Sequence, residues 1–117
     1  DPKPSRRTID HELLAAVRAE CQPCAICGAR SGAGAHHILS RGKGGDDMRA
    51  NLAPLCIGHH DVIELRVPSP CRAFYEYLHR EREDTLRYLE GKLGEGGAWD
   101  YLRRRYLASD VSVMLWP

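Results

Sequence analysis

The sequence predicts a small α+β domain, with one helix ahead of two short strands and several helices behind them. Apolar residues recur at helical spacing near both ends of the chain, and two short β-prone segments flank a glycine-rich loop. Cysteines and histidines gather between residues 21 and 60. With 117 residues, the chain has room for one core. We therefore expect a single domain over residues 9–117, behind a flexible arm at residues 1–8.

The arm and the apolar runs argue against a leader and a membrane span. Residues 1–8 are rich in proline and basic side chains, and no apolar stretch follows them as it would in a signal peptide. The longest apolar runs, such as 13–17, fall far short of the roughly 20 residues that span a bilayer. Since the chain opens on Asp1 without an initiator Met, we expect a processed chain or a piece of a longer one.

The elements of the first half follow from local pattern. Thr8 can cap a helix over about 9–20, whose apolar residues recur at helical spacing. Proline and glycine between 21 and 34 indicate a loop. The segments 35–39 and 51–55 are strand candidates, and the long loop between them predicts a hairpin with a wide excursion. A short helix over about 58–67 is expected to end before Pro68.

The second half is expected to be helical. Ser69 and Pro70 supply an N-cap and a first-turn proline. Phe74 and the leucines that follow suit a buried stripe to about residue 91, in one helix or in two joined near Glu81. Glycines at 94–97 end this stretch, and a last helix is expected over about 98–108.

The charge balance lacks the basic excess that many nucleic-acid-binding proteins have. Lysine and arginine number 17 against 16 acidic residues, which gives a net charge of +1. Any nucleic-acid site must therefore come from the local arrangement of residues.

Two pairs of residues have the spacing of zinc-binding knuckles: Cys24-x-x-Cys27 and Cys56-x-x-His59. Gly28 follows the first pair, where the turn commonly needs a positive φ. Cys21-x-x-Cys24 has the same spacing without that glycine, so we prefer Cys24 and Cys27. The odd cysteine count and the absence of a signal peptide favour a metal in a reducing compartment over disulfides. The alternative, free buried cysteines, fits Cys71 and Cys21 best.

The residues around these pairs carry a recognisable order. They are Cys-x-x-Cys, then Ala35-His-His-Ile38, then Asn51-Leu-Ala-Pro-Leu-Cys-x-x-His-His60. Over residues 24–66 this order resembles the zinc-bearing HNH endonucleases of phage and mobile elements. The resemblance implies a treble-clef-like ββα-metal motif with a structural zinc, flanked here by N- and C-terminal helices, the latter an extension over 69–117. It also implies a cytoplasmic protein of phage origin in a bacterial host.

The same resemblance implies roles for individual residues. His37 would be the general base, Asn51 the residue that orients it, and His36 with His60 the ligands of a catalytic divalent metal. Many members of the family have Asp in place of His36 and Cys in place of His59, and both exchanges keep a metal ligand. Because successive strand residues point to opposite faces, His36 and His37 can share a site only at a strand end or an irregularity.

Other polar residues near this pattern have open interpretations. Glu64 lies on the same helix face as His60, and either supports or joins the metal ligands or is an ordinary solvated glutamate. Arg41 and Lys43 would grip DNA phosphates or only add solubility. Asp46 and Asp47 are interpreted as turn or capping residues. The run 103–105 either contacts DNA or covers the core.

We therefore expect hydrolysis of DNA phosphodiester bonds, with double-stranded DNA as the partner. A neutral imidazole can activate water, and a divalent cation can stabilise the phosphate and the 3′ leaving oxygen. Two imidazole ligands favour Mn²⁺, Ni²⁺, Co²⁺ or Zn²⁺ over Mg²⁺.

The near-neutral charge predicts weak unspecific affinity, with specificity supplied by a protein partner or a further segment, in a monomer or a dimer. The main alternative is a zinc-stabilised nucleic-acid-binding or interaction module without cleavage. A zinc hydrolase acting on small molecules has less support, because no glycine or aromatic pattern marks a small-ligand pocket.

Overall fold

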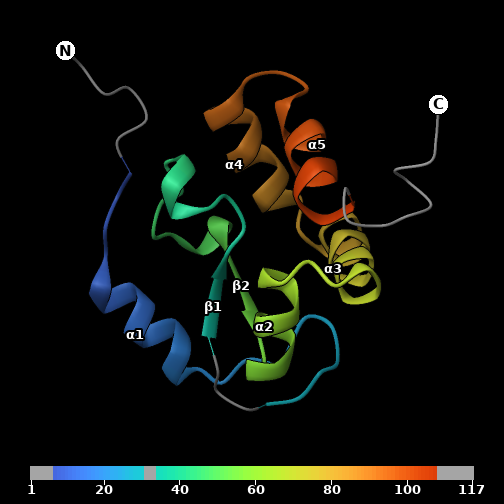
Figure 1. Cartoon of the computed structure of the whole chain (residues 1–117). Helices are drawn as coiled ribbons and strands as arrows, with labels where there is room; N and C mark the ends of the chain where they lie inside the picture. The colour runs from blue at the N-terminus through green and yellow to red at the C-terminus, as the bar shows by residue number, and fades with distance from the viewer. Residues whose placement is uncertain (1–6, 31–33, 108–117) are drawn as a thin grey trace.

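A computed structural model describes residues 7–30 and 34–107, to which all statements below refer. It is a small α+β protein with a two-stranded sheet and five α-helices among the described residues (Figure 1). Helix α1 (His11–Ala19) precedes strand β1 (Gly34–His37), and helix α2 (Ile57–Glu64) follows strand β2 (Leu52–Leu55) directly. The predicted order of helix, strand, loop, strand and helix is confirmed.

The two strands pair antiparallel over four residues each, from Gly34 opposite Leu55 to His37 opposite Leu52. They are shorter than predicted. Asn51 belongs to a 3₁₀ turn, η2 (Arg49–Asn51), and its side chain binds the backbone N–H of Leu39 at 2.7 Å. The Ile38 N–H still donates to the Asn51 carbonyl at 2.9 Å, but the Asn51 N–H bonds to Met48 within the turn, so regular strand pairing stops at His37.

The loop between the strands is tightly packed. It contains a 3₁₀ turn, η1 (Arg41–Lys43). Any side chain in place of Gly45 would force the backbone of the loop to shift. A Cβ atom on Gly45 would lie 1.8 Å from the carbonyl oxygen of Leu39, which is backbone and cannot rotate away. This contact brings the next residues, Asp46 and Asp47, into the interior, where both are buried.

The N-terminal segment is bound to this loop rather than free. The Arg7 guanidinium donates to the Gly45 carbonyl at 2.8 Å and pairs with Asp47, and the Asp47 N–H donates to the Thr8 carbonyl at 2.8 Å. Arg7 and Thr8, which were expected in a flexible arm, thus make contacts with the loop, and residues 1–6 of that arm lie outside the described residues. The cap of α1 is Asp10, whose carboxylate accepts from Leu13 N–H, and not Thr8.

The C-terminal half forms two helices, α3 (Pro68–Glu81) and α4 (Glu83–Leu93), then α5 (Gly97–Leu102), which continues as a π-helical turn, η3 (Arg103–Leu107). Arg82 separates α3 from α4 with a non-helical backbone (φ −124°, ψ 59°). Its guanidinium donates to the carbonyls of Leu52 and Arg49, both at 2.9 Å. The break therefore ties the helical extension to the start of β2.

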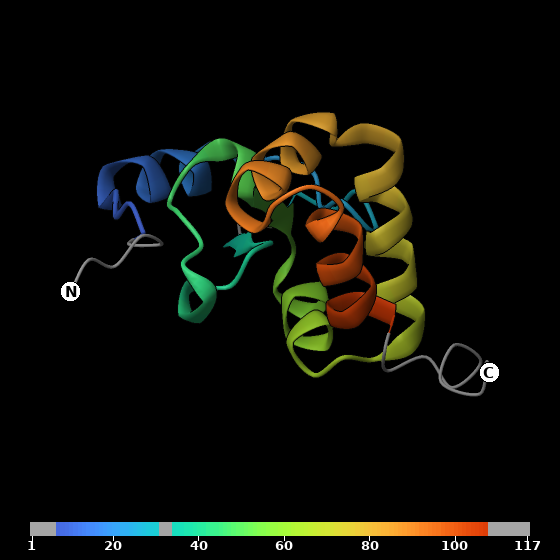
Figure 2. The same ribbon diagram turned by 90° about the horizontal axis from the view of Figure 1, so that it is seen from above.

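One core joins the sheet region to the extension. Ile38, Leu39 and Phe74 are completely buried, and they pack with residues of β2, α2 and every later helix. Helices α3, α4 and α5 lie together on one side of the sheet, with α1 at the opposite end of the molecule (Figure 2). None of the helices described here has the length and apolar character needed to cross a bilayer.

Candidate metal centres

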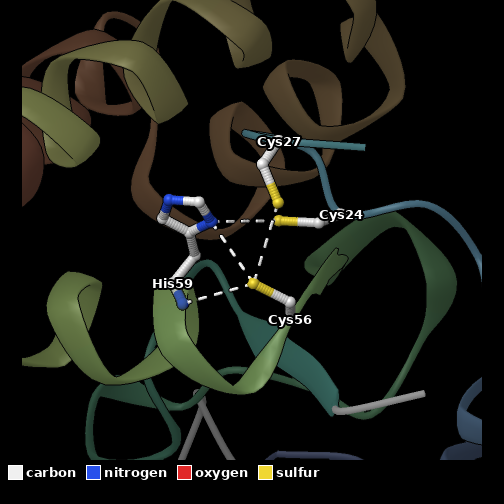
Figure 3. Close-up of side chains that lie close together, drawn as sticks. All are labelled: Cys24, Cys27, Cys56 and His59. Atoms are coloured by element: carbon white, nitrogen blue, oxygen red, sulfur yellow. Dashed lines mark hydrogen bonds between the residues drawn. The ribbon is translucent and has the colours of Figure 1, made fainter. Parts of the chain in front are cut away.

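Four predicted ligands, Cys24, Cys27, Cys56 and His59, converge in the structure (Figure 3). The two cysteines of the first pair come from the loop ahead of β1, and the second pair comes from the start of α2. The sulfurs of Cys27 and Cys56 are 3.8 Å apart, and His59 Nδ1 lies 3.6 Å from Cys24 Sγ and 3.3 Å from Cys56 Sγ. This Cys₃His group could hold a metal ion such as zinc.

The distances fit tetrahedral zinc. Zn–S bonds of about 2.3 Å and a Zn–N bond of about 2.0 Å, at tetrahedral angles, put sulfurs about 3.8 Å apart and a nitrogen about 3.6 Å from each sulfur. Two backbone N–H groups, of Ile26 and His59, donate to the Cys24 and Cys56 sulfurs at 3.4 Å. Burial opposes ionisation of Cys24, but backbone hydrogen bonds outweigh it and lower its pKa to about 6.

The preferred first knuckle agrees with this arrangement. Gly28, after Cys27, has a φ of 78°, the conformation that the turn requires. Cys21 is exposed and lies outside the group of four, and Cys71 is completely buried in the core. The alternative knuckle that begins at Cys21 is therefore not the one that the fold assembles.

A second group consists of His36, His60 and Glu64, each of which places one ligand atom within 4.8 Å of the others. His36 comes from β1, and the other two lie one helical turn apart on α2. His36 Nδ1 is 3.6 Å from Glu64 Oε1. Glu64, left open by the sequence, thus lies with the two predicted ligands and completes a set of two imidazoles and one carboxylate.

The surroundings of His36 and Glu64 set their protonation states. Burial lowers the pKa of His36 to about 4, so its imidazole is neutral at neutral pH. The Arg105 guanidinium, whose Nη2 atom is 3.9 Å from Glu64 Oε1, holds the pKa of Glu64 below its usual value, so its carboxylate is ionised. A neutral imidazole and an ionised carboxylate are the forms that bind cations.

His36 contacts Tyr106 through its other ring nitrogen. The Tyr106 hydroxyl lies 2.8 Å from His36 Nε2 and 3.4 Å from the Ile38 carbonyl, to which it can donate. When it donates to that carbonyl, its oxygen accepts the Nε2 proton, and His36 keeps its lone pair on Nδ1. His36 Nδ1 is buried, has no hydrogen-bond partner among the described residues, and points toward His60 and Glu64. An orphaned buried acceptor in this position fits a metal ligand.

His37 lies at the end of β1 and has a different partner from the one implied by the sequence. Its Nε2 atom is 2.8 Å from Asp47 Oδ1. The Asn51 side chain is fully buried and bonds to backbone groups of Leu39 and Asp46, with no hydrogen bond to His37. The expectation that Asn51 orients His37 is therefore wrong: Asn51 closes the loop, and Asp47 holds the imidazole.

The strand-end condition for His36 and His37 is met, since β1 ends at His37. Burial lowers the pKa of His37 below its usual value, against the opposing effect of Asp47. The histidine is thus neutral at neutral pH and can accept a proton.

A cavity of about 490 Å³ joins His37 to the second group. His60 and Glu64 line it with three cationic side chains, those of Arg18, Arg41 and Arg105. Arg41, for which the sequence left a phosphate contact or solubility open, thus lines the same cavity as His37. Lys43 does not line this cavity and lies in a neighbouring one.

Arg105 anchors the side of the cavity. It donates to the carbonyls of His37 and Ile38, and its Nη2 atom is 3.9 Å from Glu64 Oε1.

Comparisons do not place the chain in a family. No protein-family model, no curated protein and no solved structure matches it. The site must therefore be interpreted from its own geometry.

Sequence reasoning missed the functional contacts of three residues, Asp47, Tyr106 and Arg105. Asp47 had the signature of a turn residue, and Tyr106 had the spacing of a core residue. Arg105 was one of three adjacent arginines, and nothing in the run distinguishes it. Tyr106 and Arg105 contact His36 and His37 from far along the chain, whereas Asp47 contacts His37 from the adjoining loop.

Proposed function

We propose that the protein is a metal-dependent endonuclease of the HNH type, which hydrolyses DNA phosphodiester bonds. The observation that carries the proposal is the Nδ1 atom of buried His36, which has no hydrogen-bond partner among the described residues and lies with His60 and Glu64. His60 and Glu64 in turn line one cavity together with His37. The strand, loop, strand and helix that carry these residues are consistent with a ββα-metal motif. Zinc in the Cys₃His group would be structural, since its four ligands leave no open position.

His37 acts as the general base in this proposal. Its Nε2 proton is held by Asp47, so the lone pair of Nδ1 takes a proton from a water molecule as the water oxygen attacks phosphorus. The P–O bond to the 3′ oxygen breaks, and the leaving oxygen is protonated from solvent. Arg41 and Arg105 lie in the same cavity and neutralise charge on the phosphate oxygens.

The residues that would hold the catalytic cation are His36, His60 and Glu64. When bound, a divalent cation supplies a Lewis acid for the phosphate and the departing oxygen. A set of two imidazoles and one carboxylate suits Mn²⁺, Co²⁺, Ni²⁺ or Zn²⁺ better than Mg²⁺, which prefers oxygen ligands.

The test is nicking of supercoiled plasmid with Mn²⁺ by the parent chain and by His37→Ala. Loss of a general base lowers the rate by about 10²–10⁴-fold. His11→Ala is the matched control, because His11 is an exposed histidine on α1 that lines no part of the cavity. Equal nicking by parent and His37→Ala, or no nicking by either, contradicts the proposal.

The second candidate is a zinc-stabilised binding module that lacks cleavage. The Cys₃His group alone would serve such a module. It would not need a buried imidazole with an unpartnered nitrogen, since that atom costs free energy unless something binds it. The plasmid test separates the two, because a binding module retards plasmid without nicking it.

A further inference from the structure

A second cavity of about 570 Å³ adjoins the first, with Ser40 and Arg105 lining both. It is formed by η1, by α5 with its π-helical turn, and by the turn between α2 and α3, all visible in Figure 2. The proposed reaction uses none of its remaining residues. The cavity is therefore a separate surface that begins where the proposed cleavage site ends.

The lining of this second cavity is strongly cationic, unlike the chain as a whole. Lys43, Arg66 and Arg104 line it together with Arg105, against one acidic residue, Asp100. Asp100 is already paired with Arg104, at 3.2 Å. Within residues 7–30 and 34–107, no carboxylate lies within ion-pair distance of Lys43 or Arg66. Two cations without an acidic partner among the described residues thus line the same cavity.

The position of Arg66 is set by the backbone. It follows α2 with a φ of 59°, a left-handed conformation that is uncommon for a side chain of this size, and its Nη1 atom donates to the Arg104 carbonyl at 3.4 Å. The guanidinium thus lies beside η3 at the cavity, where it stays exposed to solvent.

We propose that this second cavity binds a backbone phosphate of the nucleic-acid strand next to the one that is cleaved, through Lys43 and Arg66. This inference rests on the proposed function, which identifies the bound strand as the DNA strand that is cleaved. Guanidinium and ammonium groups bind phosphate oxygens through charge-assisted hydrogen bonds. Ser40 and Arg105 line both cavities, and the guanidinium of Arg105 makes the cationic surface continuous, as a phosphodiester strand requires. An isolated acidic side chain of a peptide would not need that continuity.

The test measures binding of a fluorescent DNA duplex by anisotropy over a salt series, in the His37→Ala background so that bound DNA is not cut. Lys43→Gln with Arg66→Gln is expected to lower the slope of log K against log [salt] by about 2, because each lost phosphate contact removes about 0.9. Affinity at about 0.1 M salt should fall at least roughly tenfold. Both side chains are exposed, so the variant should fold as the parent does.

The matched control is Arg80→Gln with Arg87→Gln, which removes the same charge from exposed positions on α3 and α4. It should leave the slope unchanged. The inference is overturned if Lys43→Gln with Arg66→Gln binds with the parent's slope, if the control variant loses as much, or if an acidic peptide of equal charge competes as well as DNA. If the parent chain fails to nick plasmid while the slopes differ as expected, the proposed function fails and the phosphate site stands.

Discussion

His36 combines two properties that rarely occur together: it is almost fully buried, and one ring nitrogen has no hydrogen-bond partner in the described part of the chain. The other nitrogen is bound to the Tyr106 hydroxyl, 70 positions away in the sequence. The C-terminal helical turn thus holds the side chain in place beside His60 and Glu64.

The first prediction concerns Tyr106→Phe. Without the hydroxyl, nothing holds the proton on His36 Nε2, and the affinity of the second group for Mn²⁺ or Co²⁺ should fall about 10–100-fold. Calorimetric titration of the zinc-loaded protein measures it. Tyr75→Phe is the control, since the Tyr75 hydroxyl has no hydrogen bond to any described residue and its loss should change nothing. Unchanged affinity in Tyr106→Phe would show that the tyrosine only packs.

The second prediction concerns Asp47, which holds His37 through one carboxylate oxygen. Asp47→Ala should lower the nicking rate about 10–100-fold, while Asp47→Asn, which keeps an acceptor oxygen, should lose less. Arg7→Ala is the control, because it removes the ion pair between Arg7 and Asp47 but leaves Asp47 on His37. If Arg7→Ala slows nicking as much as Asp47→Ala, the carboxylate acts only by anchoring that segment.

At the scale of elements, the sheet is the weakest part of the fold. Two strands of four residues each are too small to be stable alone. The Cys₃His group lies between the loop ahead of β1 and the start of α2. Strand β1 carries His36, and α2 carries His60. A metal bound there would stabilise the same elements that position the second group.

The third prediction follows from this arrangement. Cys56→Ser should remove about one zinc per chain and lower the melting temperature, because metal binding free energy becomes folding free energy in small domains. Zinc content by atomic emission and thermal unfolding by circular dichroism measure the two effects. Cys21→Ser, an exposed cysteine outside the group, should keep both values. Loss of zinc in Cys21→Ser instead would favour the alternative knuckle.

Elements and ligands were predictable where their cause is local. Helical spacing, the two strand candidates and the Cys-x-x-Cys and Cys-x-x-His pairs each depend on a few adjacent residues, and the fold contains all of them. The partner of His37 was not predictable, because it depends on how Gly45 and the N-terminal segment turn Asp47 inward. The contact of Asn51 was not predictable for a related reason. Its side-chain amide hydrogen-bonds to three backbone groups of the loop, which belong to Leu39 and Asp46, and not to His37.

For the whole molecule, the near-neutral net charge conceals a strong separation of charges. Four cationic side chains line the second cavity against Asp100 alone, while two of the acidic residues, Asp46 and Asp47, are buried inside the fold. Asp46 accepts from the Tyr88 hydroxyl at 2.6 Å and pairs with Lys92 at 2.9 Å, which connects the loop between the strands to α4. The loop that holds His37 is thus also stabilised by the helical extension.

The fourth prediction is an acid dependence of stability that Asp46 contributes. Burial opposes its ionisation, but hydrogen bonds from Tyr88 and Thr8 and the pair with Lys92 outweigh it and lower the pKa of the carboxyl to about 2. A carboxyl whose pKa is lower in the folded state stabilises the fold above its unfolded pKa, near 3.9, and this stabilisation is lost as the pH falls toward 2. The parent chain should therefore exceed Asp46→Asn in free energy of unfolding at pH 7, with the difference shrinking below about pH 5. Urea unfolding at several pH values measures it, and a difference that stays constant between pH 7 and 3 would contradict the role assigned to this ion pair.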